Sequence, residues 1–217
     1  AGVNVDLAPV ADVRRNTNGF LAVEHRTFGS TASTVAARAC AFAKGVGSSG
    51  VVSTFKHFPG LGRAVASTDT GPVTITASAG AIRADDQAYR TCAGPAGPPS
   101  IVMISSASYP RLTGGELPAV LSPEIYTTEL PVEDHVTAPT ISDDLGAGAL
   151  ARLPSVGLRA LDAGLDLLLY GTNSSAVGRA YATLVAAARS GALPAARLQA
   201  AGSRILALKH SMGLPNS

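Results

Sequence analysis

The chain has 217 residues, enough for one large domain or two small ones with a substantial core. Hydrophobic residues make up 46% of it and charged residues only 15%, which is typical of a compact globular protein and excludes a disordered one. The net charge is +2, and the basic residues are scattered without interleaved aromatics, so we expect no nucleic-acid partner. No apolar run approaches the ~20 residues that span a bilayer, so we expect no transmembrane segment.

Apolar runs alternate along the chain with stretches of helical spacing. The runs are continuous rather than alternating in polarity, as expected for parallel strands that are buried on both faces. The expected strands are residues 3–10, 51–55, 101–105, 140–142 and 165–170. Strand, helix, strand, helix predicts a parallel α/β fold with right-handed crossovers.

The expected helices are marked by apolar stripes and by capping residues. Ser30 or Thr31 caps the first helix, and Ser122-Pro123 marks the start of another. The three stripes are Val35, Ala39, Phe42 and Val46; Val177, Tyr181, Leu184 and Ala188; and Leu198, Ala201, Ile205 and Leu208. No linker or composition shift separates these elements, so residues 1–217 are expected to form a single domain.

The most informative segment runs from Thr54 to Gly62. The apolar run 51–55 leads a Lys-His pair, Lys56 and His57, directly into a Pro-Gly-x-Gly turn. A buried strand that ends in polar residues at a rigid turn is where barrel enzymes place binding groups. The alternative is a strand end with incidental polar residues before a turn.

The segment Lys56-His57-Phe58-Pro59-Gly60-Leu61-Gly62 resembles the signature of glycoside hydrolase family 3, in its β-N-acetylglucosaminidase branch. The resemblance extends from Asn4 to the end of the chain, where residues 203–209 resemble the closing helix of the family's barrel. A closed (β/α)8 barrel has eight strands and takes ~250 residues. The resemblance therefore implies a TIM-type (β/α)8 barrel that lacks its first strands, the C-terminal two-thirds of the fold.

The segment Pro139-Thr140-Ile141-Ser142-Asp143-Asp144-Leu145 ends an expected strand in two carboxylates. Barrel strands deliver their last residues to the catalytic face. Ser-Asp-Asp-Leu resembles the nucleophile motif of the family, which implies that Asp143 is the nucleophile. Asp144 is then expected to cap or support the helix that follows, and the alternative makes both aspartates helix caps.

Two further matches, together with the Lys-His pair, imply a sugar-binding set. Asp12 ends Ala-Pro-Val-Ala-Asp, which resembles a strand-end motif whose aspartate grips sugar hydroxyls. Arg26 opens Arg-Thr-Phe-Gly, which resembles a loop whose arginine binds the sugar. The implied substrate-binding residues are Asp12, Arg26, Lys56 and His57. Taken singly, Asp12 is equally readable as a helix cap and Arg26 as a surface residue.

The chain departs from the family pattern at the acid/base. In the branch that it resembles, Asp-Ser-His follows Gly-x-Gly four residues later, and the histidine is the acid/base. The same spacing from Gly62 reaches Ser67-Thr68-Asp69, which puts Asp69 in the place of the histidine. A two-residue slip would leave glycine there, so the ungapped register is favoured. Asp69 can act only if it is protonated when the leaving group departs, so reduced or lost activity is an alternative.

The resemblance implies a retaining β-N-acetylhexosaminidase that hydrolyses terminal β-linked GlcNAc, with cell-wall muropeptides as a source. The partner expected is a small oligosaccharide or amino-sugar substrate, and association could complete the barrel. The alternatives are a non-catalytic sugar-binding relative, an inactive barrel fragment and, ranked lower, a β-glucosidase. No His/Cys/Asp cluster has ligand spacing, so no metal or other cofactor is expected.

Cys40 and Cys92 are the two cysteines of the chain, and they fall in consecutive expected helices. Such helices are neighbours in a βαβ barrel, so a disulfide is expected, with two buried free thiols as the alternative. The disulfide favours an extracytoplasmic or secreted protein over a cytoplasmic one. The chain begins at Ala1 without methionine, so we read it as a processed or trimmed product whose missing leader says little about localisation.

Overall fold

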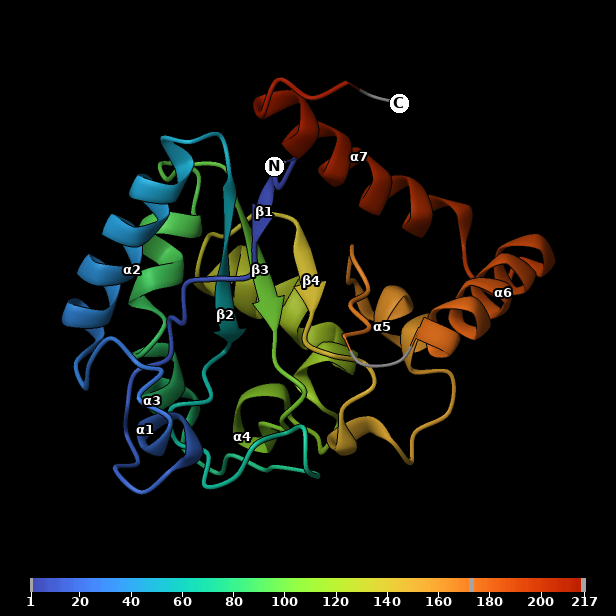
Figure 1. Cartoon of the computed structure of the whole chain (residues 1–217). Coiled ribbons are helices and arrows are strands. Elements are labelled where there is room, and N and C mark those ends of the chain that lie inside the picture. The colour runs from blue at the N-terminus through green and yellow to red at the C-terminus, as the bar shows by residue number, and fades with distance from the viewer. Residues whose placement is uncertain (1, 172–173, 216–217) are drawn as a thin grey trace.

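A computed structural model describes residues 2–171 and 174–215 of the chain (Figure 1). At its centre lies a curled parallel sheet in the order β1-β2-β3-β4, formed by Val5–Asp6, Val52–Phe58, Ser100–Ile104 and Thr140–Ser142. Val5 pairs with Val52, Ser53 with Ser100, and Val102 with Thr140. The result is an α/β half-barrel, consistent with a partial TIM barrel.

The fifth expected strand, residues 165–170, is not a full strand. Leu167 makes a single parallel bridge to Ile141 and exchanges backbone hydrogen bonds with β4, from Leu167 N to Thr140 O at 2.9 Å and from Ser142 N to Leu167 O at 3.0 Å. This segment thus runs beside β4 and continues the curl of the sheet. Its direction agrees with the expectation, and its ladder is shorter.

Helices and turns connect the strands. The α-helices are α1 (Phe20–Val23), α2 (Ala32–Gly47), α3 (Ala79–Arg83), α4 (Pro110–Thr113), α5 (Val156–Ala163), α6 (Ser174–Ser190) and α7 (Ala195–Ser211). The 3-10 turns are η2 (Ala119–Leu121) and η4 (Gly148–Leu150), and the π-helical segments are η1 (Tyr89–Ala93) and η3 (Ile125–Glu133). Among the described helices, none has both the length and the apolar content to cross a bilayer.

Helix α2 confirms the predicted cap and stripe. The Thr31 hydroxyl accepts a hydrogen bond from Thr34 N at 3.3 Å, which satisfies one of the free N–H groups of the first turn. Val35 and Ala39 are fully buried on the face that packs against β2. Ala39 is part of the main core, which continues through Phe55 and Ile104 in the sheet, whereas Phe42 and Val46 of the stripe are half-buried.

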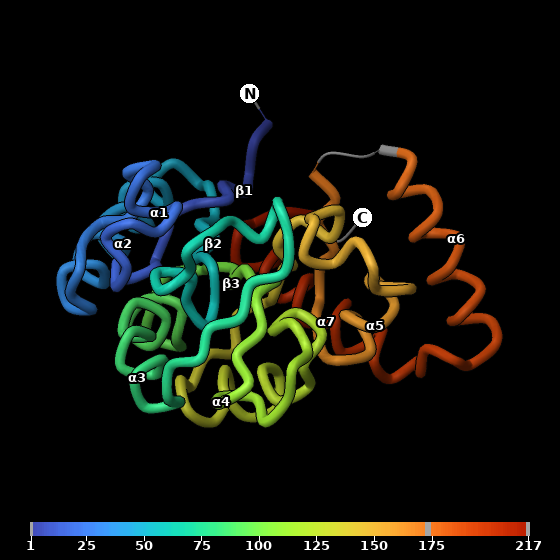
Figure 2. Tube along the Cα trace, turned by 90° about the horizontal axis from the view of Figure 1, so that it is seen from below, coloured from blue at the N-terminus to red at the C-terminus, as the bar shows by residue number. Residues whose placement is uncertain are grey.

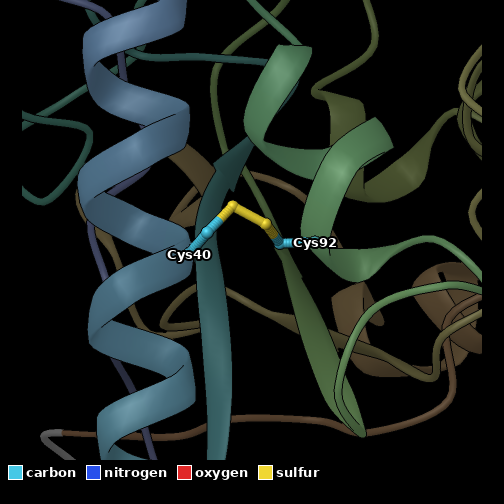
Figure 3. The surroundings of a disulfide bond; sticks show 2 residues. All are labelled: Cys40 and Cys92. Carbon is cyan, nitrogen blue, oxygen red and sulfur yellow. A yellow bond between two sulfur atoms is a disulfide. The ribbon is translucent and has the colours of Figure 1, made fainter.

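The disulfide between Cys40 and Cys92 is present and joins α2 to η1 (Figure 3). The two Cα atoms lie 5.7 Å apart, and the bond links positions 52 residues apart in the sequence. It sits on the outside of β2 and β3, beside the core that these helices form with the sheet (Figure 3). The predicted pairing is thus confirmed.

The C-terminal helices α6 and α7 differ from α2 in where they pack and in how much of their apolar face is buried. Helix α7 crosses the end of the sheet at which the strands begin (Figure 1). Arg204 of α7 binds the buried Asp166 through Nη2 at 2.7 Å, which fixes the helix to the segment beside β4. Of the predicted stripe of α6, only Leu184 is half-buried; Val177 and Tyr181 are 48% and 70% exposed, Ala188 is exposed as well, and the buried residue of this turn is the neighbouring Ala187.

Candidate active site

A small cavity of about 120 Å³ lies at the carboxyl end of the sheet. Five of the six site residues expected from the sequence line it, namely Arg26, Lys56, His57, Asp69 and Asp143. Its remaining walls are Leu7, Phe20, Leu61, Ser67, Thr68, Met103 and Leu169. Figure 2 looks onto this end of the molecule, where the loops that follow β1, β2 and β3 lie beside one another. Side chains that are far apart in the sequence are thus gathered in one place.

The glycine-rich turn after β2 positions the Lys-His pair against the loop after β1. Gly60 has φ +123°, a conformation that residues with a side chain rarely adopt. A Cβ at Gly62 would collide with the carbonyl group of Val13, so the close approach of the two loops requires glycine. The hydroxyl of the buried Tyr109 donates to Gly60 O at 3.0 Å. The turn is thereby held from both sides.

Asp12 does not line the cavity but lies beneath His57. Its Oδ2 is 2.8 Å from His57 Nδ1, and its Oδ1 accepts hydrogen bonds from Leu61 N at 2.6 Å and His57 N at 3.3 Å. The side chains of Asp12 and His57 are 0% and 5% exposed. Asp12 is therefore not among the residues that line the cavity, and the direct contact with sugar hydroxyls that its motif implies stays a prediction.

Lys56 and Arg26 supply positive charge to the cavity. Lys56 is half-buried at the end of β2, and burial is the main reason why its pKa is lowered from 10.5. The nearby Arg26 guanidinium lowers this pKa further, whereas Asp143 and Asp12 raise it. Arg26 follows α1, stacks over the Phe20 ring at 5.8 Å, and binds Glu24 Oε2 at 3.3 Å.

Asp143 follows β4 and faces the cavity half-buried. Its backbone N–H donates to Ile104 O at 3.0 Å, which continues the pairing of β3 and β4 past the end of the ladder. Asp144 has another task than the expected helix cap. Its Oδ1 accepts from Gly146 N at 2.8 Å and from Gly171 N at 3.0 Å, and no helix begins at this residue. Asp144 thus ties together the two loops beside the nucleophile candidate.

Asp69 reaches the cavity from the loop that follows β2. The loop is fastened to the segment after Asp143, because Gly148 N donates to Asp69 O at 3.0 Å and Ala149 N donates to Thr68 O at 2.9 Å. The Ser67 hydroxyl donates to Asp69 Oδ2 at 3.0 Å and accepts from Asp69 N at 3.1 Å. Asp69 is solvent-exposed, in contrast to the half-buried Asp143.

Several cavity residues were not predicted from the sequence. Leu7, Met103 and Leu169 form apolar walls. They lie towards the carboxyl ends of the expected strands, and this position could have predicted that they line the cavity. In the sequence, Ser67 stands where the family motif has an aspartate. The spacing of the motif does not predict its hydrogen bond to Asp69.

The cavity combines two carboxylates, two cationic side chains and one imidazole. Such a set suits a neutral polyhydroxylated ligand, because each hydroxyl can donate to a carboxylate and accept from a cation. In the described part of the chain, no three His, Cys, Asp or Glu side chains form a group that could hold a metal ion. The carboxylates and the imidazole of the cavity can transfer protons, and a carboxylate can also attack as a nucleophile.

Two known proteins that resemble the chain are a glycosyl hydrolase and a β-hexosaminidase by name. The chain is 36% identical over 214 residues to an "uncharacterized secreted glycosyl hydrolase" of Arthroderma benhamiae, covering 95% of this chain and 60% of the relative. It is 33% identical over 216 residues to the β-hexosaminidase LpqI of Mycobacterium bovis, covering 96% of this chain and 54% of that one. The chain thus spans little more than half the length of these relatives.

A solved structure of a family 3 enzyme has the same fold as the chain. The glycoside hydrolase family 3 β-N-acetylglucosaminidase from Paenibacillus sp. str. FPU-7 superposes with a TM-score of 0.91 and 25% identity, covering 98% of this chain and 40% of that one. The model of the glycosyl hydrolase family 3 N-terminal domain matches residues 1–208. The fold, the cavity and these matches together establish that the chain belongs to glycosyl hydrolase family 3.

Proposed function

We propose that the chain carries the active site of a retaining β-N-acetylhexosaminidase that removes terminal β-linked GlcNAc, with cell-wall muropeptides as a source of substrate. The observation that carries the proposal is one shared cavity, in which Asp69 and Asp143 lie with Arg26, Lys56 and His57. Retaining glycosidases use two such groups on either side of the scissile bond. The names of the relatives, β-hexosaminidase and β-N-acetylglucosaminidase, support the choice of sugar.

The proposed reaction has two steps. In the first, the Asp143 carboxylate attacks the anomeric carbon, and the protonated Asp69 gives its proton to the glycosidic oxygen, so that the alcohol leaves. In the second, the Asp69 carboxylate takes a proton from water, the water oxygen attacks the anomeric carbon, and the bond between that carbon and Asp143 breaks, which frees the sugar and restores the Asp143 carboxylate. The configuration at the anomeric carbon is retained, and Asp69 ends in its starting protonation state.

A second candidate function is sugar binding without turnover. The observation that favours it is the environment of Asp69, which is exposed, accepts a hydrogen bond from the Ser67 hydroxyl, and shares the cavity with Lys56 and Arg26. The Ser67 hydroxyl, Lys56 and Arg26 are hydrogen-bond donors, so these surroundings suit an accepting carboxylate oxygen rather than an O–H that is to be donated. The two candidates differ only in the competence of Asp69.

Hydrolysis of an aryl β-N-acetylglucosaminide tests the proposed function. We expect turnover of this substrate to exceed that of the matching aryl β-glucoside. Asp143→Ala is expected to abolish turnover together with the covalent adduct that a fluorinated aryl sugar leaves on the protein. Asp144→Asn is the matched control, because an amide oxygen can still accept from Gly146 and Gly171. Labelling of Asp144 or of a glutamate would contradict the assignment.

We also propose that association completes the barrel. The described sheet has β1 at one edge and the segment beside β4 at the other, whereas a closed barrel has eight strands. Additional strands, from another segment or chain, would pair with these edges and enclose the cavity. The exposed Val177 and Tyr181 of α6 offer apolar surface on the same side as the second edge (Figure 1).

A further inference from the structure

We propose that Asp12 is a positioning residue that fixes His57 as the Nδ1–H tautomer, so that Nε2 faces the sugar as a hydrogen-bond acceptor. This inference rests on the proposed function for the identity of the ligand. Its structural part, the tautomer of His57, stands on the contacts of the two side chains alone. No role in orienting His57 follows from the sequence motif around Asp12.

The hydrogen bonds of Asp12 determine which ring nitrogen of His57 carries a proton. Oδ1 takes two backbone N–H groups, from Leu61 and His57, so Oδ2 is the oxygen that meets the imidazole at 2.8 Å. An ionised carboxylate can only accept hydrogen bonds, so the facing ring nitrogen must carry the proton. The pair is enclosed, with exposed fractions of 0% and 5%, so water does not compete for these positions. Nδ1 of His57 is therefore the protonated nitrogen.

The other ring nitrogen is then available to the ligand. His57 lines the cavity, and its Nε2 has no hydrogen bond to any residue that the structure describes. In the neutral Nδ1–H tautomer Nε2 carries a lone pair and accepts. Lys56 and Arg26, in the same cavity, can only donate. A sugar hydroxyl both donates and accepts, so it matches this combination, whereas a fluorine or methoxy group in its place cannot donate to Nε2.

Nitrogen-15 NMR of the imidazoles tests the tautomer directly. The chain has only four histidines, and His57→Gln assigns the signal of His57. Above ~pH 8, where an ordinary histidine is neutral, we expect the wild type to show a protonated Nδ1 and an unprotonated Nε2. In Asp12→Asn the amide oxygen is expected to keep the two backbone N–H groups and to present its NH₂ to the ring. Nδ1 must then accept, and the proton is expected to move to Nε2.

The control and the ligand separate this proposal from the proposed function. Asp85→Asn changes another buried aspartate, which binds Arg15 and Arg63 and does not touch His57, so the tautomer is expected to persist. We expect Asp12→Asn to weaken binding of N-acetylglucosamine by about 10-fold or more, because Nε2–H, Lys56 and Arg26 would then all donate and the sugar hydroxyl would lose Nε2 as the acceptor of its proton. A wild-type Nε2–H tautomer, or no change in a folded Asp12→Asn, overturns the proposal. If the tautomer behaves as expected but no aryl glycoside is cleaved, only the proposed function falls.

Discussion

Lys56 and His57 are neighbours on one strand, yet their surroundings give them opposite roles. His57 is held by a buried carboxylate on one side of its ring and faces the cavity with the other. Lys56 is half-buried with Arg26 nearby, and both effects disfavour its ammonium form. The carboxylate of Asp143 works in the other direction. The charge of Lys56 thus depends on the balance of these neighbours.

This balance predicts the alkaline limit of activity. Because the pKa of Lys56 is lowered, Lys56 should lose its proton below pH 10.5, and the ligand then loses a charged donor. We expect kcat/KM for an aryl β-N-acetylglucosaminide to fall on the alkaline side below that pH. Lys56→Arg should lower the activity at neutral pH. It should also shift the decline in kcat/KM to higher pH, because a guanidinium stays charged. Lys44→Arg, at an exposed lysine, is the control. If the alkaline decline of kcat/KM were unchanged in Lys56→Arg, Lys56 would not be the group that causes it.

At the residue scale, the motifs predicted which side chains share the cavity but not how they are bonded. Lys56, His57, Arg26, Asp69 and Asp143 meet because each lies at or after the carboxyl end of a strand, a consequence of parallel topology. The contact of Asp12 with His57 depends on how far the loop after β1 and the end of β2 extend beyond the sheet. The spacing of motifs along the chain does not give this distance.

At the scale of elements, α2 and η1 are held together by both packing and a covalent bond. Ala39 and Ala43 of α2 and Tyr89 of η1 belong to one core, and the Cys40–Cys92 bond lies beside it. Tyr89 also packs edge-on against Phe58 at the end of β2, with ring centroids 5.1 Å apart. The bond therefore supports the outer layer next to the strand that carries Lys56 and His57.

Removing this bond should lower stability measurably. The cross-linked positions are 52 residues apart, for which the chain-entropy model gives about 4 kcal/mol. We expect the Cys40→Ala/Cys92→Ala double variant to lose up to this free energy of unfolding, measured by urea denaturation. A reducing agent should bring the wild type to the same value and leave the double variant unchanged. An unfolding midpoint that does not respond to reduction would show that the bond contributes nothing.

The elements differ in how far the sequence predicted them. Helix α2 has a cap and an apolar spacing that agree, and it forms as expected. The start at Ser122-Pro123 leads instead into the π-helical η3, which contains Pro131, a residue without the N–H that a regular helix interior uses. In α6 the periodicity gave the helix correctly, but the apolar face stays exposed at Tyr181. Periodicity predicts which face is apolar and not what covers it.

At the scale of the whole molecule, the described sheet ends at β1 on one side and at the segment beside β4 on the other, and part of α6 is exposed. If association completes the barrel, light scattering should give a mass above the 21.8 kDa of one chain, and turnover per chain should rise with protein concentration. Tyr181→Ser should weaken both effects, because 70% of that side chain is exposed in the single chain. A monomer whose turnover is independent of concentration would rule out a need for association.

In the proposed mechanism, Asp69 and Asp143 act as one catalytic pair. The most direct measurement compares Asp69→Ala on two substrates, with Ser67→Ala as a control that keeps the carboxylate. A natural GlcNAc disaccharide needs protonation of its leaving group and should be cleaved about 10²-fold or more slowly, whereas an activated aryl glycoside should retain a rate much closer to wild type, with azide rescuing the second step. Equal losses on both substrates, or no loss on either, would contradict the account and favour a protein that binds the sugar without cleaving it.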